Sequence, residues 1–197
     1  MPDNVETMID DELADTGPGA TLRPMLVRSY DPSDANAVNA VALAAFAQYD
    51  AVYEDLETLR AAVGATSELA EQGELIVAEE AGRIAGAVVY CAAGSQPWAA
   101  FFDPAWPIIR MLVVDPAARG RGIGRRLTEE CIARARRGDA EVIALHTSPA
   151  MEVALSLYLR IGFRLERRLP DRYGVPYAVY LLPLRETAVA DGASALA

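Results

Sequence analysis

The sequence predicts a single mixed α/β domain of the α+β kind, in which helices flank a central sheet. Short β-branched runs alternate with segments whose apolar residues recur every three or four positions, and two of the runs lie close enough to pair as a hairpin. The chain has 197 residues, of which 52% are hydrophobic and 23% charged, a balance typical of one globular domain.

The first half of the domain is expected to contain three strands and two helices. Asp31-Pro-Ser-Asp34 supplies turn and cap residues at the start of the first helix, and Glu80-Ala-Gly82 joins two apolar runs at a spacing typical of an antiparallel hairpin. The expected elements are a strand over 25–30, helices from 35 to about 49 and over 56–69, and strands over 74–79 and 83–91.

The second half is expected to alternate strands and helices. Apolar residues from Ile123 to Ala135 recur at helical spacing, and Ser148 followed by Pro149 predicts the cap and first position of another helix, which Gly162 would end. The expected elements are strands over 108–114 and 141–146, helices over 123–137 and from 149 to about 161, and two last strands over 163–168 and 177–182.

The net charge of −10 is concentrated outside this region. Residues 1–22 carry six acidic residues and no basic one, and residues 186–197 are small and polar, so both are expected to be disordered tails around a domain at 23–185. The domain itself is close to neutral, and Glu129 and Glu130 interrupt its arginine-rich segment. This balance argues against a nucleic-acid partner.

Several other classes of protein are disfavoured. The longest apolar run stops at eight residues, too short to span a bilayer, and the N-terminus lacks the basic and apolar regions of a signal peptide. These features predict a cytoplasmic protein without membrane association. Cys91 and Cys131 have no metal-ligand spacing, so no metal site is expected.

Arg119-Gly-Arg-Gly-Ile-Gly124, between a predicted strand and a predicted helix, carries the most chemical information. Its glycines allow close approach of a ligand to the backbone, and the amides at a helix start bind anions. Arginines there conflict with the positive end of the helix dipole, which indicates a bound polyanion such as a pyrophosphate. A plain glycine turn with solvated arginines is the alternative. The G-x-G-x-G spacing matches neither the P-loop nor the dinucleotide fingerprint.

Three segments resemble the GNAT acyltransferase superfamily. Met111-Leu-Val-Val-Asp-Pro-Ala-Ala-Arg-Gly-Arg-Gly-Ile-Gly124 is similar to its acetyl-CoA-binding motif, [R/Q]-x-x-G-x-[G/A] after a strand. Ala154-Leu-Ser-Leu-Tyr-Leu-Arg-Ile-Gly-Phe163 resembles its A-x-x-L-Y-x-x-x-G-F segment, and 74–91 resembles its hairpin. The ordered set covers about residues 25–182. It implies a mixed, mostly antiparallel sheet that is splayed at the CoA-binding strand.

The resemblance also implies how acetyl-CoA, the cosubstrate, would be held. The backbone of Leu112, Val113 and Val114 would bind the pantetheine arm and acyl group. The pyrophosphate would be held by the loop and the helix start, which comprise Arg119, Gly120, Arg121, Gly122, Ile123, Gly124 and the amide of Arg125. Transfer would be a direct attack by an acceptor amine, with no metal and no covalent enzyme intermediate.

Two proton-transfer groups are needed, an acid for the departing thiolate and a base for the attacking ammonium. Tyr158 matches the family's usual acid, although it also lies on an apolar stripe and could be a core residue. The family's glutamate positions are occupied here by Ile108 and His146, and Met151 replaces an asparagine. His146, the only histidine, is therefore the candidate base, with a structural role as the alternative. Tyr30, Tyr49 and Tyr53 are further candidates to reach the acceptor.

The acceptor is expected to lie against the loop before the cofactor strand. The candidate substrate-binding residues in this loop are Trp98, Phe101, Phe102, Asp103 and Trp106. The aromatic residues are either a pocket wall or a hydrophobic plug, and the acid could pair with an ammonium or only stabilise a turn.

The sequence thus predicts an acetyl-CoA-dependent N-acetyltransferase, a monomer or homodimer, that acts on a primary amine of a small molecule or peptide. A non-catalytic acyl-CoA-binding regulatory domain is the alternative. Nucleic-acid binding through the arginine-rich helix is the weakest hypothesis.

Overall fold

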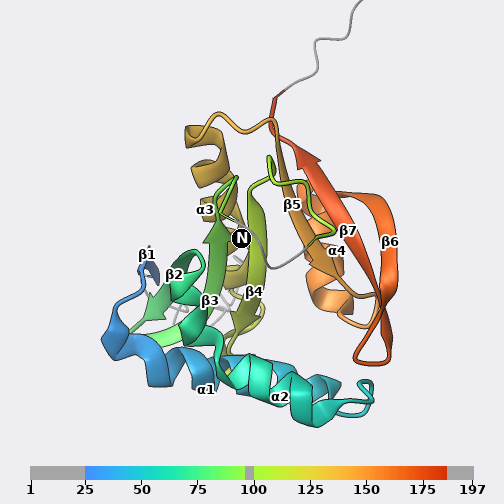
Figure 1. The fold of residues 1–197 in the computed structure, drawn as a ribbon. Helices are drawn as coiled ribbons and strands as arrows, with labels where there is room; N and C mark the ends of the chain where they lie inside the picture. The colour runs from blue at the N-terminus through green and yellow to red at the C-terminus, as the bar shows by residue number, and fades with distance from the viewer. Residues whose placement is uncertain (1–24, 96–99, 186–197) are drawn as a thin grey trace, which may run out of the picture.

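The computed structural model describes residues 25–95 and 100–185, which form one twisted sheet with helices on both faces (Figure 1). The strands are β1 (Met25–Ser29), β2 (Glu74–Glu80), β3 (Arg83–Cys91), β4 (Ile108–Val114), β5 (Val142–Thr147), β6 (Arg164–Arg172) and β7 (Val175–Pro183). Their order in the sheet is β1-β2-β3-β4-β5-β7-β6. Every neighbouring pair is antiparallel except β4 and β5, which are parallel. The predicted mixed, mostly antiparallel sheet is confirmed.

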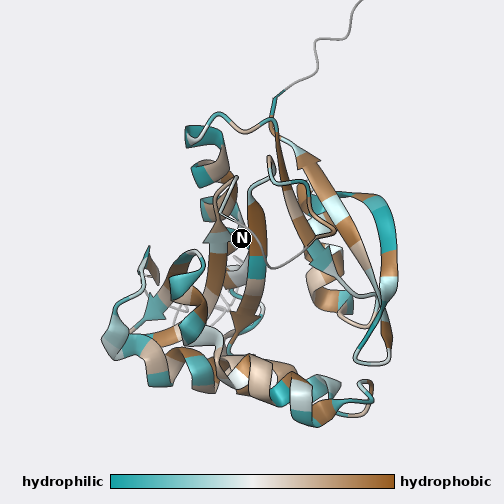
Figure 2. Cartoon of the chain, viewed as in Figure 1, coloured by the Kyte–Doolittle hydropathy of each residue, from teal (hydrophilic) through white to brown (hydrophobic). Residues whose placement is uncertain are grey.

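Four α-helices cover the sheet in two pairs. They are α1 (Ala35–Phe46), α2 (Leu56–Gly64), α3 (Ile123–Arg137) and α4 (Glu152–Ile161). Side chains alternate between the faces of each strand, so Leu75 and Val77 pack with α1 and α2, whereas Ile76 and Ala78 pack with α3. The central strands β3 and β4 are mostly hydrophobic, while the edge strand β6 is largely hydrophilic (Figure 2).

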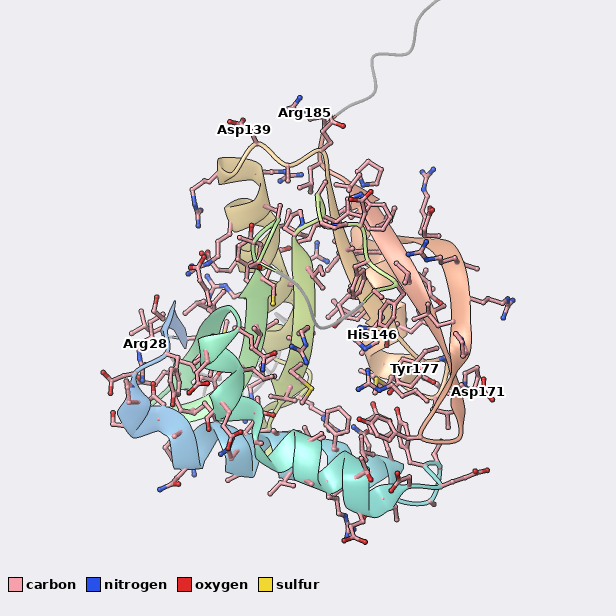
Figure 3. The ribbon with its side chains drawn as sticks, in the orientation of Figure 1. Arg28, Asp139, His146, Asp171, Tyr177 and Arg185 are labelled. Carbon is pink, nitrogen blue, oxygen red and sulfur yellow. The ribbon has the colours of Figure 1, made fainter. Side chains whose placement is uncertain are left out.

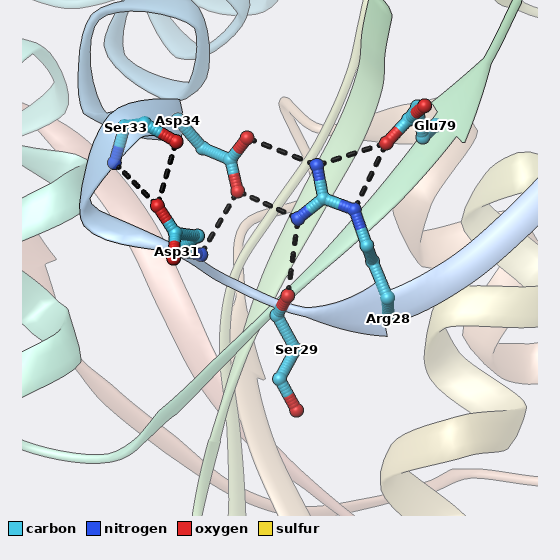
Figure 4. Close-up of polar contacts among 6 residues, drawn as sticks. All are labelled: Arg28, Ser29, Asp31, Ser33, Asp34 and Glu79. Atoms are coloured by element: carbon cyan, nitrogen blue, oxygen red, sulfur yellow. Dashed lines mark hydrogen bonds and ion pairs between the residues drawn. The ribbon is translucent and has the colours of Figure 1, made fainter. Parts of the chain in front are cut away.

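The first strand is fastened to the first helix by a charged cluster (Figure 4). The guanidinium of Arg28 donates to Asp34 at 2.7 Å and to Glu79 at 2.9 Å, which joins β1, β2 and the turn before α1. Asp31 caps that turn by accepting from the amide of Ser33. The partners of Arg28 raise its pKa, and Arg28 in turn lowers the pKa of Asp34. The predicted turn and cap therefore exist, and this corner has a defined geometry.

The sheet opens between β4 and β5, as Figure 1 shows. The two strands pair at only two positions, Ile108 with Ala144 and Ile109 with Leu145. Beyond them β4 contains a bulge, where Met111 has a positive φ of 49° and the register against β3 shifts. A bulge increases the local twist of its strand, so β4 turns away from β5. The splay implied by the family resemblance is confirmed.

Three predicted helices begin or end elsewhere than expected. Helix α1 ends at Phe46, and the remainder of its predicted segment is a 3-10 helix over Ala47–Tyr49. Helix α2 ends at Gly64, and the remainder of the predicted segment is a 3-10 helix over Thr66–Glu71. The prediction that α4 starts at Pro149 is wrong. The Ser148 hydroxyl does accept from a nearby amide, that of Ala150, but the Ser148 carbonyl accepts from the amide of Met151 and closes a separate turn, so α4 begins only at Glu152.

The remaining sequence expectations concern segments at the ends of the chain and membrane association. The two predicted tails and the outer limits of the predicted domain lie outside the described residues. Within residues 25–95 and 100–185, no helix is long and apolar enough to cross a membrane.

Candidate active site

A cavity of about 310 Å³ occupies the region where β4 and β5 diverge. It is lined by β4 and the end of β5, by α4, by α2 with the 3-10 helix after it, and by the turn between β6 and β7. Among the lining residues are Leu112, His146, Thr147, Met151, Tyr158 and Tyr177. Segments from both halves of the sheet therefore meet at one space, as required of a site that brings two substrates together.

The glycine-arginine loop ends at a helix start that has no side-chain cap. Gly122 is the cap residue of α3, with a φ of 80°, and the first turn of the helix contains no acidic residue. The first helical hydrogen bond runs from the amide of Arg126 to the carbonyl of Gly122, so the amides of 123–125 precede it and lack helical partners. Amides without helical partners at the positive end of a helix are suited to bind an anion.

The glycines leave space in front of these amides. A Cβ placed on Gly120 or Gly122 would have no heavy atom within 4 Å, so the loop faces an open cradle. Gly124 lies on the other side, where a Cβ would be 3.6 Å from Val114 of β4 and 3.5 Å from Leu157 of α4. The helix start is thereby packed against the end of the splayed strand.

The arginine side chains of the loop make contacts within the protein. Arg119 donates to the carbonyl of Ala45 and the side chain of Gln48 at the end of α1. Arg121 pairs with Glu80 at 2.6 Å, and Arg125 pairs with Glu129 at 2.8 Å. These contacts occupy the arginine side chains and position the loop.

Tyr158 is buried against the cavity from α4, with 6% of its surface exposed. Its ring contacts Phe163 edge to face at a centroid distance of 5.7 Å, so it is also part of the core. Burial raises the pKa of its phenol well above the usual value. Tyr158 is consequently a protonated hydroxyl at neutral pH, the state that a general acid requires.

His146 lines the same cavity from β5, and Tyr177 of β7 lies beside it (Figure 3). The two rings are 5.6 Å apart, and Phe101 and Phe102 pack on His146 at 5.5 and 5.8 Å. Burial first, and then the positive charges of Arg172 and Arg110, lower the pKa of His146 to about 4. The imidazole is therefore neutral near pH 7 and can accept a proton, although it is a weak base.

The loop before β4, which the sequence predicted to bind the acceptor, lies near the cavity only in part. Phe101 and Phe102 lie behind His146, and Phe102 belongs to the core. Asp103 accepts from the amide of Ala105 at 2.8 Å and stabilises a turn, while Trp106 packs on the core. None of these four described residues lines the cavity, and only Phe101 and Phe102 form a hydrophobic plug behind the imidazole. Trp98 lies outside the described residues.

The tyrosine candidates occupy different places. The hydroxyl groups of Tyr53 and Tyr177 are 3.0 Å apart, so Tyr53 holds a cavity residue without itself being in the wall. Tyr30 and Tyr49 pack against the core around α1.

Sequence reasoning missed several charged and aromatic residues of the cavity wall. Arg110, Arg172, Tyr173 and Glu68 line it, on β4, β6, the β6–β7 turn and the 3-10 helix after α2. No local motif marks them, because the topology of the sheet brings them together. Alternation along β4 would not have found Arg110 either, because the bulge at Met111 interrupts it: Leu112 packs with the α3 cluster, whereas Ile108 and Met111 pack with the α1 cluster.

A splayed sheet, an uncapped helix after a glycine loop and a buried tyrosine facing the gap together define the acyl-CoA-dependent N-acyltransferase class. The sequence profile of the acetyltransferase (GNAT) family matches residues 39–163. The chain belongs to this family and is an acetyltransferase, an enzyme class whose acetyl donor is acetyl-CoA.

Known proteins similar to the chain are N-acetyltransferases. N-alpha-acetyltransferase RimI of Mycobacterium tuberculosis is 43% identical over 56 residues, which are 28% of this chain. This match spans about a third of that relative, 34% of its length.

Two solved structures share the fold over most of both chains. The paia N-acetyltransferase of Thermoplasma acidophilum in complex with coenzyme A has a TM-score of 0.64 and 15% identity, over 81% of this chain and 99% of that one. The ribosomal-protein-alanine N-acetyltransferase of Brucella melitensis has a TM-score of 0.59 and 22% identity, over 80% and 99%.

Proposed function

We propose that this chain transfers the acetyl group of acetyl-CoA directly to a primary amine of a small molecule or a peptide, in the cavity between β4 and β5. The observation that carries the proposal is that the open edge of β4 and the protonated Tyr158 border one cavity, while the uncapped start of α3 packs against the end of β4 at Val114. Cys131, a potential acyl carrier, is fully buried with a raised pKa and does not line the cavity, which favours direct transfer.

The groups that would hold the donor are mainly backbone atoms. The amides of 123–125 and the cradle in front of Gly120 and Gly122 suit a pyrophosphate. Between 110 and 114 the edge of β4 that faces β5 has no ladder partner in the described residues, so Leu112, Val113 and Val114 can bond an extended pantetheine arm. When bound, acetyl-CoA supplies a thioester carbonyl that an amine can attack.

Tyr158 would act as the general acid. Its raised pKa keeps the hydroxyl protonated, and its position on the cavity wall allows it to give that proton to the departing sulfur. A buried phenol is a weak acid, but the same low-dielectric space also raises the proton affinity of a thiolate formed beside it, so the phenol can give that thiolate its proton.

His146 would receive the proton of the attacking amine, either directly or through water. Since its pKa is about 4, it cannot efficiently deprotonate a lysine ammonium, whose pKa is about 10.4. An α-amino group, with a pKa of about 7.7–8.0, is partly neutral near pH 8 without a strong base. A weak base therefore favours an α-amine. The names of the similar proteins, an N-alpha-acetyltransferase and a ribosomal-protein-alanine N-acetyltransferase, agree with this acceptor.

The test has two stages. Calorimetric titration with acetyl-CoA and CoA, with dephospho-CoA as a control, is expected to show micromolar binding. Thiol release and product mass are then measured with α-amines and with side-chain lysines. Transfer to α-amines supports the proposal. Tight binding without transfer to any amine would instead indicate a non-catalytic acyl-CoA-binding domain, and a folded protein that binds neither ligand would contradict the donor site.

A further inference from the structure

Two arginines lie in the acceptor end of the cavity. Arg110 lines it from β4 and Arg172 from the end of β6, on opposite sides of the splay. Glu68 is the only acidic residue among the described lining residues. The acceptor end is therefore positively charged, although the substrate proposed to enter it carries an amine. A site for a simple cationic amine would have the opposite charge.

Contacts within the protein orient both guanidinium groups. Arg110 is partly buried and donates to the side-chain oxygen of Gln72 at 2.9 Å, a contact that orients its guanidinium. Arg172 lies over the ring of Tyr173 at 5.1 Å and donates to its hydroxyl at 3.3 Å. Aromatic stacking of this kind holds an arginine in place with its donors available at the edge.

The positive charges of the two guanidinium groups affect each other and the imidazole of His146. Burial lowers the pKa of Arg110, and the charge of Arg172 lowers it further; after burial, Arg172 and Arg110 also lower the pKa of His146. Several other arginines of the described chain are paired with carboxylates, among them Arg28, Arg121, Arg125 and Arg134. No ion pair is recorded for Arg172 in the described residues. Two like charges at a cavity that is partly shielded from water favour an anionic ligand.

We propose that Arg110 and Arg172 bind a carboxylate of the acceptor, so that the acetylated substrate is an amine that also carries an acid group within the same small molecule or at the start of the same peptide. The inference rests on the proposed function and specifies its substrate class. The carboxylate can be that of a free amino acid, or the side chain of an acidic residue following the N-terminal one. Both present the same planar oxygen pair to the guanidinium groups.

The experiment compares acceptors in matched pairs. The first set contains free amino acids and their amides, and the second contains N-acetylation-competent peptides such as Ala-Glu-amide and Ala-Gln-amide. The expected result is a kcat/KM about tenfold or more higher for the acid member of at least one set, the size of one hydrogen bond to a charged group. Preference in the first set identifies a free amino acid, and in the second an acidic peptide. Equal rates in both sets overturn the inference while leaving the proposed function standing.

Substitutions assign the preference to its residues. Arg172→Gln and Arg110→Gln are expected to reduce the acid-to-amide ratio about tenfold, and Arg172→Glu to reverse it. Arg168→Gln is the matched control, because Arg168 is an exposed residue of the same strand that does not line the cavity. An unchanged ratio in both glutamine variants, with the fold verified by circular dichroism, contradicts the assignment.

If no amine is acetylated, the proposed function fails. The inference that the two arginines bind a carboxylate can then still be tested by measuring binding. Calorimetric titration of the acetyl-CoA-loaded protein with the same pairs should show tighter binding of the acid member, and Arg172→Gln should abolish the difference. Equal binding of acid and amide overturns the inference without any reference to catalysis.

Discussion

The guanidinium of Arg119 donates to the backbone carbonyl of Ala45 at 3.1 Å and thereby ties the start of the glycine-arginine loop to the end of α1. A second nitrogen of the same side chain donates to Gln48 at 3.0 Å. Helix ends leave carbonyls without partners, and an arginine is well suited to satisfy them. The glycine-arginine loop is thus braced by α1, whose last residue, Phe46, lines the cavity.

Arg119→Gln should therefore lower the free energy of unfolding by about 1 kcal/mol, the usual contribution of such a hydrogen bond. Urea denaturation measures this change. Arg126→Gln is the control, because Arg126 is exposed and no ion pair is recorded for it in the described residues. A loss of CoA affinity with unchanged stability would show that the Arg119 side chain contacts the ligand instead.

Gly122→Trp should weaken CoA binding by about tenfold or more, because the new side chain would fill the open cradle in front of the α3 amides. Calorimetric titration provides the measurement. Gly82→Trp is matched for strain, since Gly82 has a φ of 75°, against 80° for Gly122, and also has open space beside it, but it lies in the β2–β3 turn. Equal losses in the two variants would mean that backbone strain, not the cradle, causes the effect.

Tyr158→Phe should reduce kcat by about a hundredfold or more with little change in the affinity for CoA, because it removes only the acidic hydroxyl. Steady-state kinetics and titration together separate these effects. Tyr180→Phe is the control for loss of a buried tyrosine hydroxyl in the same core. If both variants retain the wild-type kcat, Tyr158 is a packing residue.

His146 should titrate with a midpoint near pH 4, not near its ordinary value of 6.5. Because the chain has one histidine, its imidazole resonances in a tag-free sample need no assignment. The unfolded chain binds this proton more tightly than the folded one. Stability should therefore be full above about pH 6.5 and fall by roughly 3 kcal/mol between pH 6.5 and 4.

The same pKa determines the pH dependence of the reaction. In a plot of kcat/KM against pH, a loss of activity due to protonation of His146 should appear near pH 4. A second loss at higher pH would report protonation of the acceptor amine. His146→Gln, which keeps a neutral hydrogen-bonding side chain, should remove the loss near pH 4. A resonance midpoint near 6.5 would show that the imidazole is accessible to water.

Much of the fold could be predicted because local signals agreed with the tertiary structure. The Glu80-Ala-Gly82 turn, the apolar stripe of α3 and the end of α4 at Gly162 all lie where the pattern placed them. The start of α4 was misplaced because a serine followed by proline suits both a helix cap and an isolated turn. Only the hydrogen bond from Met151 to the Ser148 carbonyl distinguishes them.

The cavity was harder to foresee. Met111 adopts a positive φ although methionine gives no sign of it, and that bulge directs β4 away from β5. The lowered pKa of His146 depends on burial and on Arg110 and Arg172, residues from three strands that meet only in the folded sheet. The glycine-arginine motif identified the donor region, but it could not show that Arg119 contacts α1.

The two residue pairs between β4 and β5 leave the sheet with a seam. On one side, β1 to β4 form a continuous hydrogen-bonded unit, and on the other, β5, β7 and β6 form a second. A donor bound along β4 would supply the missing backbone partners across that seam. Binding of acetyl-CoA would then join the two halves of the sheet through backbone hydrogen bonds. Hydrogen exchange of the amides from Arg110 to Val114 would become slower, and the cavity would become rigid only when the donor is bound.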